Sequence, residues 1–109
     1  MRQIKFRMWN KEIKEMYDVG LINFQQRLIF MKHYEGYTQS SFALEDVELM
    51  QFTGLHDKNG KEIYENMIIN NEYIVVYDFC KFVLKNIKNG DITDFKKDGV
   101  YEITREYFE

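Results

Sequence analysis

The chain has 109 residues, of which 45% are hydrophobic and 17% aromatic, and its formal net charge is -3. This apolar content is enough for an ordered core, which excludes a wholly disordered chain, and the length fits one domain or two small subdomains. The acidic balance disfavours a dedicated duplex-DNA binder, which usually shows a basic footprint. The charge is uneven, because residues 1–52 are neutral overall and residues 53–109 hold the whole excess of acid.

Cysteine content and hydropathy indicate the compartment. The single cysteine, Cys80, excludes an intrachain disulfide and fits a reducing cytoplasm. The N-terminus alternates and is charged, so we expect no signal peptide. No apolar run approaches membrane-spanning length, and we therefore expect a cytoplasmic protein with no membrane partner.

The first thirty residues predict short antiparallel strands. Residues 3–9 alternate, with Ile4, Phe6 and Met8 on one face and the polar side chains together with Trp9 on the other, which is typical of a half-buried strand. The next strand is expected to pair back as a hairpin, and Gly20 is expected to close that hairpin unit. The strands predicted in this part are 3–9, 14–19, 21–24 and 27–31.

Residues 32–42 have the composition of a loop and include two tyrosines. We expect the least ordered backbone of the chain in this segment. Ser41, followed by Glu45 and Asp46, indicates a short helical turn after the loop, although the spacing is one residue off a strict capping box.

The most informative stretch is 47–69, in which two apolar runs flank a polar turn. Asn59 and Gly60 both tolerate the positive φ that tight turns need, so they predict the turn. Gly54 indicates a bend or bulge at the end of the first strand. Asn66 lies just after the second apolar run begins. Asparagine is second only to glycine in tolerating a left-handed backbone conformation, so we expect one at this position.

Two segments in and next to this stretch, together with several residues near the N-terminus, form a recognisable pattern. The residues concerned are Asp46–Leu55, Asp57–Glu65, Met1, Arg2, Ile4–Arg7, Trp9 and Lys11. Together they cover about two-thirds of the chain, and the combination resembles the YopX family, small proteins encoded by phages and prophages of Gram-positive bacteria. The resemblance implies a small β-rich protein with an SH3-like barrel in its C-terminal half. It implies no particular activity.

One departure from the family pattern concerns the residues after Tyr64 and Glu65. The family usually continues with Gly-Asp-Ile-Val, whereas this chain continues with Asn-Met-Ile-Ile from residue 66. Asn66 can keep the backbone role of the glycine, but Met67 cannot keep any role of the acid. Two interpretations of Met67 stay open: it replaces a functional acid, or the acid is structural in relatives and Met67 fills a gap in the core.

The C-terminal part predicts further short strands between turns, at 72–77, 82–87, 92–95 and 100–104, and residues 105–109 fray or form a helical turn. Their regular spacing favours a small antiparallel barrel or sheet. We therefore predict a mainly β fold (β-rich α+β). A β-hairpin subdomain with a variable loop covers 1–45, an SH3-like small β-barrel covers 46–109, and the two form one compact unit.

Neither motifs nor spacing predict catalysis. His33, His56 and Cys80 are far apart in sequence and lack a nucleophile signature. The segment from Asp57 superficially resembles a calcium loop, but its glycine is fourth rather than sixth and no glutamate falls at the twelfth position. The acidic clusters at 45–48 and 91–98 fit solvated strand edges better than catalytic pairs. We expect a protein that is not an enzyme, with no catalytic residues, no cofactor and no metal.

The candidate partner-binding residues are Lys5, Arg7, Trp9, Tyr34 and Tyr37. Two cations and a tryptophan on one strand face, with tyrosines nearby, suit single-stranded nucleic acid; the alternative is a solvated face on which Trp9 covers the rim of the core. Aromatic side chains and methionines are equally typical of protein interfaces, or of a well-packed core. Our first hypothesis is a phage or prophage accessory protein that binds a protein partner or forms a homo-oligomer. The alternative, a single-stranded nucleic-acid-binding module, is disfavoured by the net charge.

Overall fold

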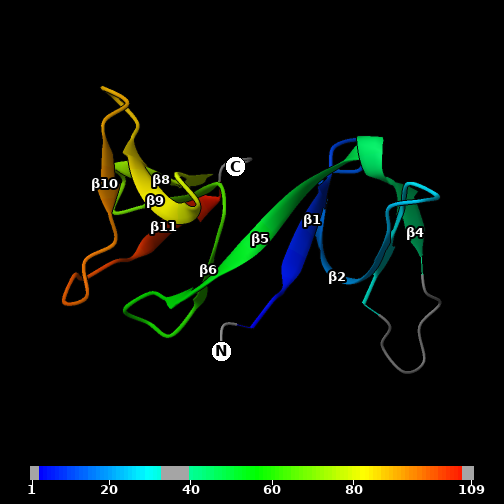
Figure 1. The fold of residues 1–109 in the computed structure, drawn as a ribbon, viewed down its shortest axis with the longest axis horizontal. Helices are drawn as coiled ribbons and strands as arrows, with labels where there is room; N and C mark the ends of the chain where they lie inside the picture. Colours follow the sequence, from blue (N-terminus) through cyan, green and yellow to red (C-terminus); the bar gives the residue numbers. More distant parts are fainter. Residues whose placement is uncertain (1–2, 33–39, 107–109) are drawn as a thin grey trace. The chain divides into compact units, whose positions relative to one another are not determined.

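The structure is a computed structural model that describes residues 3–32 and 40–106 (Figure 1). The chain divides into two compact units, one formed by Lys5–Gln51 and the other by Phe52–Glu109 with Met1–Ile4. The division falls inside a single strand, whereas the sequence placed it between residues 45 and 46. Each unit is built from antiparallel strands, which confirms the mainly β prediction.

The N-terminal unit is an antiparallel sheet with the strand order β4-β3-β2-β1-β5. Its elements are β1 (Phe6–Asn10), β2 (Glu15–Asn23), β3 (Leu28–Met31), β4 (Ser41–Ala43), the 3-10 helix η1 (Leu44–Asp46) and the first part of β5 (Val47–His56). The helical turn expected from Ser41 therefore begins at Leu44, because Ser41 itself pairs with Phe30 in the sheet. Residues 33–39, most of the predicted loop, lie outside the described residues.

The alternation of β1 places the core of the N-terminal unit on one face of that strand. Met8 is fully buried and clusters with Ile29 and Val47. Asn10 ends the strand, and its side-chain oxygen accepts the N–H groups of Glu12 and Ile13 at 3.0 and 3.1 Å. This capping turns the chain into β2, as the sequence predicts.

The expectation that Gly20 closes the first hairpin is wrong. β2 continues past Gly20 to Asn23, and its pairing with β3 shifts register between Val19 and Leu21. A Cβ atom at Gly20 would lie 2.9 Å from the Cα of Lys32. The glycine thus permits a bulge and a close backbone approach inside the strand, which is a second common role of glycine in sheets.

The C-terminal unit contains a five-stranded antiparallel sheet with the order β10-β9-β8-β7-β11. Its strands are β7 (Met67–Ile69), β8 (Tyr73–Asp78), β9 (Lys81–Asn86), β10 (Ile92–Asp94) and β11 (Ile103–Glu106), while β6 (Glu62–Tyr64) pairs with the second part of β5. In the described part of the chain, β10 and β11 are the two edges of this sheet. The buried apolar residues of the unit are Phe52, Ile63, Tyr64, Met67, Ile68, Ile69, Val75, Val83 and Leu84.

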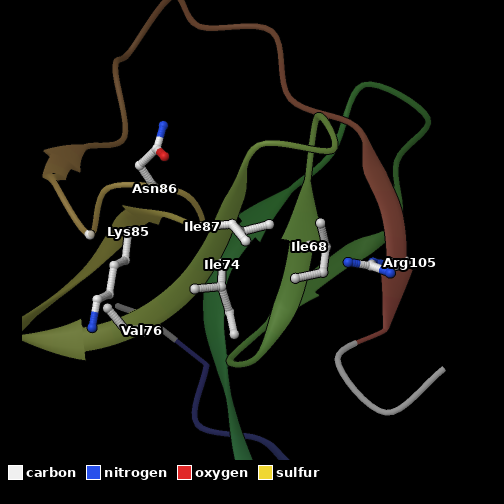
Figure 2. Close-up of a pocket in the computed structure, with 8 residues that line it drawn as sticks. Ile68, Ile74, Val76, Lys85, Asn86, Ile87 and Arg105 are labelled. Carbon is white, nitrogen blue, oxygen red and sulfur yellow. The ribbon is translucent and has the colours of Figure 1, made fainter.

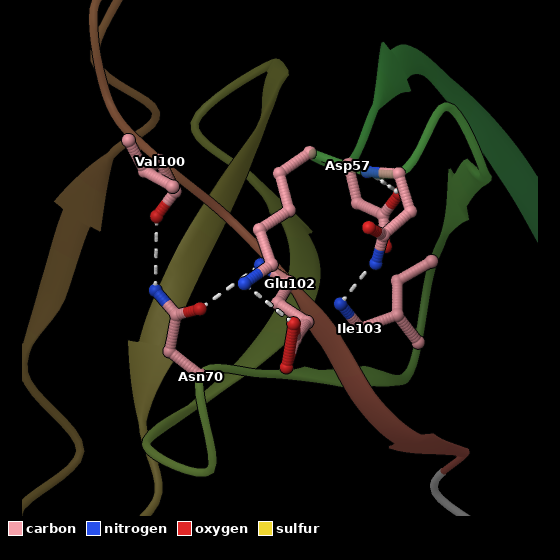
Figure 3. Close-up of polar contacts among 7 residues, drawn as sticks. Asp57, Asn70, Val100, Glu102 and Ile103 are labelled. Carbon is pink, nitrogen blue, oxygen red and sulfur yellow. Dashed lines mark hydrogen bonds and ion pairs between the residues drawn. The ribbon is translucent and has the colours of Figure 1, made fainter.

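The turn between β5 and β6 is built around the Asp57 side chain (Figure 3). Its Oδ1 accepts the N–H groups of Asn59 and Lys61, each at 2.9 Å, and its Oδ2 accepts the N–H of Ile103 at 3.2 Å. Asp57 is only 7% exposed. Burial acts to raise the pKa of this carboxyl, but the three N–H donors and the nearby charge of Lys61 outweigh burial, so the pKa lies below its ordinary value.

The last strand lies further along the chain than the sequence predicts, at 103–106 rather than 100–104. The backbone before it bonds to side-chain and backbone groups of earlier turns instead of a strand. The Asn70 side chain donates to the carbonyl of Val100 at 3.2 Å and accepts the N–H of Glu102 at 2.9 Å, and the backbone N–H of Asn70 donates to the carbonyl of Glu102 at 2.9 Å (Figure 3). Arg105, expected to fray or turn, therefore lies in β11 and pairs with Ile68 of β7.

Two local predictions for the β6–β7 turn can be compared with the structure. Asn66 has φ +70°, which confirms the left-handed position, and its N–H donates to the carbonyl of Val75 at 2.8 Å. Met67 is 4% exposed, and its sulfur accepts the N–H of Tyr64 at 3.3 Å. Met67 thus fills the core and also serves as a turn partner, the role in which a carboxylate would be the stronger acceptor.

Replacing Asn66 tests the left-handed turn. Asn66→Ala is expected to lower the free energy of unfolding by about 1 kcal/mol, because the short polar side chain of asparagine offsets the Cβ crowding of this conformation by local hydrogen bonding, and alanine cannot. Asn66→Gly keeps the conformation without that cost and is the matched control. Urea denaturation of both variants measures the difference, and equal stability of the alanine and glycine variants would contradict the assignment.

Replacing Asp57 tests the buried carboxylate. Asp57→Asn is expected to lower the free energy of unfolding by about 2 kcal/mol at neutral pH, because a charged acceptor shared by three backbone N–H groups is lost. Since the folded-state pKa is below the ordinary 3.8, this contribution is fully present above pH 3.8 and is lost as the pH falls through the lower folded-state value.

The stability difference between wild type and Asp57→Asn should therefore shrink in acid. Denaturation curves at neutral pH and at about pH 3 provide the comparison. Asp98→Asn, at an exposed aspartate in a turn, is the control and should change stability little at either pH. A difference that stays constant with pH would show that Asp57 acts through shape rather than charge.

Candidate partner-binding surfaces

The predicted face of Lys5, Arg7 and Trp9 belongs to the N-terminal unit. Arg7 and Trp9 lie on β1, which pairs with β2 on one side and β5 on the other. All three residues are half-buried, and the Nε atom of Arg7 is buried. Asp18 lies opposite Arg7, and Glu48 lies opposite Trp9. Because opposite residues share a face of the sheet, carboxylates accompany the cations there.

The structure therefore brings together part of the predicted set. Arg7 and Trp9 share one face of β1, as the alternation of the sequence predicts. The neighbouring acids and the half-burial make this face less suited to phosphate than the sequence implied. Tyr34 and Tyr37 lie outside the described residues.

A pocket of about 390 Å³ lies on the five-stranded sheet of the C-terminal unit (Figure 2). The strand register explains its lining. Arg105 pairs with Ile68, and Ile68 pairs with Ile74. Ile74 in turn pairs with Lys85. These four side chains thus form a row across β11, β7, β8 and β9, and Ile87 joins the apolar middle of the row.

Two cations flank this apolar middle, as Figure 2 shows for Lys85 on one side and Arg105 on the other. Neighbouring strands lie about 4.8 Å apart, so the two Cα atoms are about 14 Å apart across the row. Both side chains are exposed, and neither forms an ion pair with any residue that the structure describes. The pocket therefore offers an apolar bed between two cations, although the net charge of the chain is negative.

The β8–β9 hairpin ends in an unusual two-residue turn. Phe79 and Cys80 have φ +50° and +62°, the left-handed values that hairpins normally obtain from Asn-Gly. For an ordinary side chain this conformation costs about 1–2 kcal/mol. Phe79 is 74% exposed, so burial within the unit does not offset that cost. Asp78 supports the turn by accepting the N–H of Phe79 at 2.9 Å.

His33 lies outside the described residues, and the other groups weighed for catalysis are dispersed. Cys80 is exposed in the β8–β9 turn, and His56 is exposed near the end of β5, with its ring edge-on to Phe52. Asp94 forms a surface ion pair with Lys81 at 2.7 Å. Within residues 3–32 and 40–106, no three His, Cys, Asp or Glu side chains are grouped so that they could hold a metal. The same residues include no helix of membrane-spanning length and hydropathy.

Sequence reasoning missed two features of the C-terminal unit, namely the pocket between Lys85 and Arg105 and the left-handed turn at Phe79 and Cys80. The row from Arg105 to Lys85 depends on the register of four strands, which alternation alone does not fix. The hairpin tip had a local signal, because Phe79 and Cys80 are poor turn residues between two strong strands.

The two units together define a small, mainly β protein assembled from antiparallel strands. The family model described as "YopX protein" matches residues 5–107, so the chain belongs to the YopX family, as the resemblance of its motifs predicts. Among solved structures, the crystal structure of protein EF1440 from Enterococcus faecalis is similar, with a TM-score of 0.70 and 22% identity over 97% of this chain and 94% of that chain. At this identity the likeness concerns the fold. A comparison with curated proteins gave no match.

Proposed function

We propose that this YopX-family protein is a phage- or prophage-encoded accessory protein of the host cytoplasm that works without catalysis, by binding another protein or further copies of itself. The observation that supports this most directly is the pocket between Lys85 and Arg105. An apolar bed flanked by two exposed cations fits a partner segment in which apolar side chains stand beside carboxylates.

The chemistry of the pocket favours binding over catalysis. Three described groups with a shifted pKa are Tyr17, Asp57 and Lys58, and none of these three lines the pocket. The pKa of Asp57 is lowered by hydrogen bonds that serve the turn, and the pKa of Lys58 is raised by its ion pair with Glu102 at 2.8 Å. The shifts of Asp57 and Lys58 therefore have structural causes, which supports a non-enzymatic role.

The C-terminal unit supplies the scaffold in this proposal. Its five antiparallel strands, of three to six residues each, support the view of an SH3-like small barrel that presents its pocket to a partner. The carboxylate of Asp57 and the amide of Asn70 hold β11 in place, and β11 brings Arg105 to the rim of the pocket.

A labelled peptide that alternates aspartate with leucine tests the pocket by fluorescence anisotropy. Lys85→Glu or Arg105→Glu is expected to weaken binding of this peptide at least tenfold, about 1.4 kcal/mol, because attraction at the rim becomes repulsion. Lys97→Glu, in an exposed turn outside the pocket, is the charge-matched control and should leave binding unchanged.

Two results would contradict the assignment of the pocket. One is equal binding by the wild type and both rim variants. The other is equal affinity for a peptide in which lysine replaces every aspartate. Loss of binding in the Lys97→Glu control would indicate that only general charge is sensed.

A second candidate function is a single-stranded nucleic-acid-binding module, favoured by Arg7 and Trp9 on one face of β1. In that case a labelled oligothymidine should bind in a salt-dependent manner, and Arg7→Ala should weaken it severalfold. Absence of any anisotropy change at low salt would remove this candidate.

A further inference from the structure

The tip of the β8–β9 hairpin has a conformation that its own unit does not require. Asn-Gly would adopt the same turn without steric cost, yet the chain places Phe79 and Cys80 there. The ring of Phe79 is 74% exposed and so gains little from folding. Strain that persists without local benefit is a feature of recognition sites.

The tip and the pocket are chemically complementary. The tip presents an aromatic ring next to the carboxylate of Asp78. The pocket presents isoleucines between Lys85 and Arg105, and its volume of about 390 Å³ is ample for one aromatic ring. The hairpin is also a rigid ligand, since its six cross-strand pairs fix the ring in place before any contact forms.

We propose that the hairpin tip of one copy of this chain docks into the Lys85–Arg105 pocket of a second copy. Phe79 occupies the apolar bed formed by Ile68, Ile74 and Ile87, and Asp78 lies close to a cation of the rim. This inference rests on the pocket assigned under the proposed function and names its occupant.

The shared strands make the contact reciprocal. Phe79 of the tip directly follows β8 and lies five residues after Ile74 of the pocket, or about 17 Å along an extended chain. Two hairpins that pack in opposite directions can therefore place each tip at the pocket of the other copy. Such a two-fold arrangement leaves neither tip exposed and closes as a dimer.

The test compares oligomeric state by sedimentation equilibrium in the presence of a reductant, which excludes a disulfide through Cys80. The wild type is expected to dimerise as concentration rises. The double variant Phe79→Asn, Cys80→Gly is expected to dimerise at least tenfold more weakly while its Tm rises by about 5 °C, because the new turn residues relieve the left-handed strain. A misfolded variant would lose both stability and association. Weaker dimerisation together with a higher Tm therefore separates the proposal from simple misfolding.

Phe24→Asn is the matched control. Phe24 is 72% exposed in the β2–β3 turn of the other unit, so its loss removes a similar apolar surface. This variant should dimerise like the wild type. Equal weakening by the Phe24 and Phe79 variants would contradict the proposal, because it would indicate non-specific apolar association.

Charge exchange adds a second measurement. Lys85→Glu should weaken the dimer, and adding Asp78→Lys to the same chain should restore part of the loss, since each tip then meets a complementary rim. A wild type that stays monomeric at every concentration would overturn the inference. If the pocket nevertheless binds the aspartate–leucine peptide, the proposed function stands and only its assigned occupant is wrong.

Discussion

The carboxylate of Asp57 determines how the C-terminal unit closes. One oxygen holds the local turn, and the other accepts the N–H of Ile103, 46 residues further along the chain. Asn70 acts in a similar way, since its amide both donates to and accepts from the backbone that leads into β11 (Figure 3). The last strand is therefore located as much by two side chains as by its pairing with β7, its only neighbour in the described sheet.

The position of β11 also determines how the pocket is lined. β11 pairs with β7 through an irregular register between Ile103 and Arg105. Because the N–H of Ile103 is bound by Asp57, the irregularity has a fixed position, and Arg105 comes to lie opposite Ile68. A cation from a distant part of the sequence is thus brought to the apolar row. The rim of the pocket depends on a hydrogen bond whose acceptor lies outside that pocket.

Local chemistry was predictable from the sequence, and long-range register was not. Asn66 was placed correctly in the left-handed region, because few residues other than glycine and asparagine adopt it readily. The role of Gly20 was wrong, because its close approach to Lys32 depends on how β2 and β3 pair. Likewise, residues 100–102 look like a strand, but their backbone groups bond to side-chain and backbone groups of earlier turns. The pocket was missed for the same reason, since it exists only once four strands are aligned.

The distance in sequence between Asp57 and its last partner also matters while the chain is being made. The N-terminal unit is contiguous, so all of its strands have left the ribosome before the C-terminal unit is complete. The C-terminal unit must wait for residue 103, and meanwhile the apolar strands β7 to β9 lack their edge partner β11. Until β11 forms, β7 presents an unpaired edge, and unpaired strand edges are prone to misassociation.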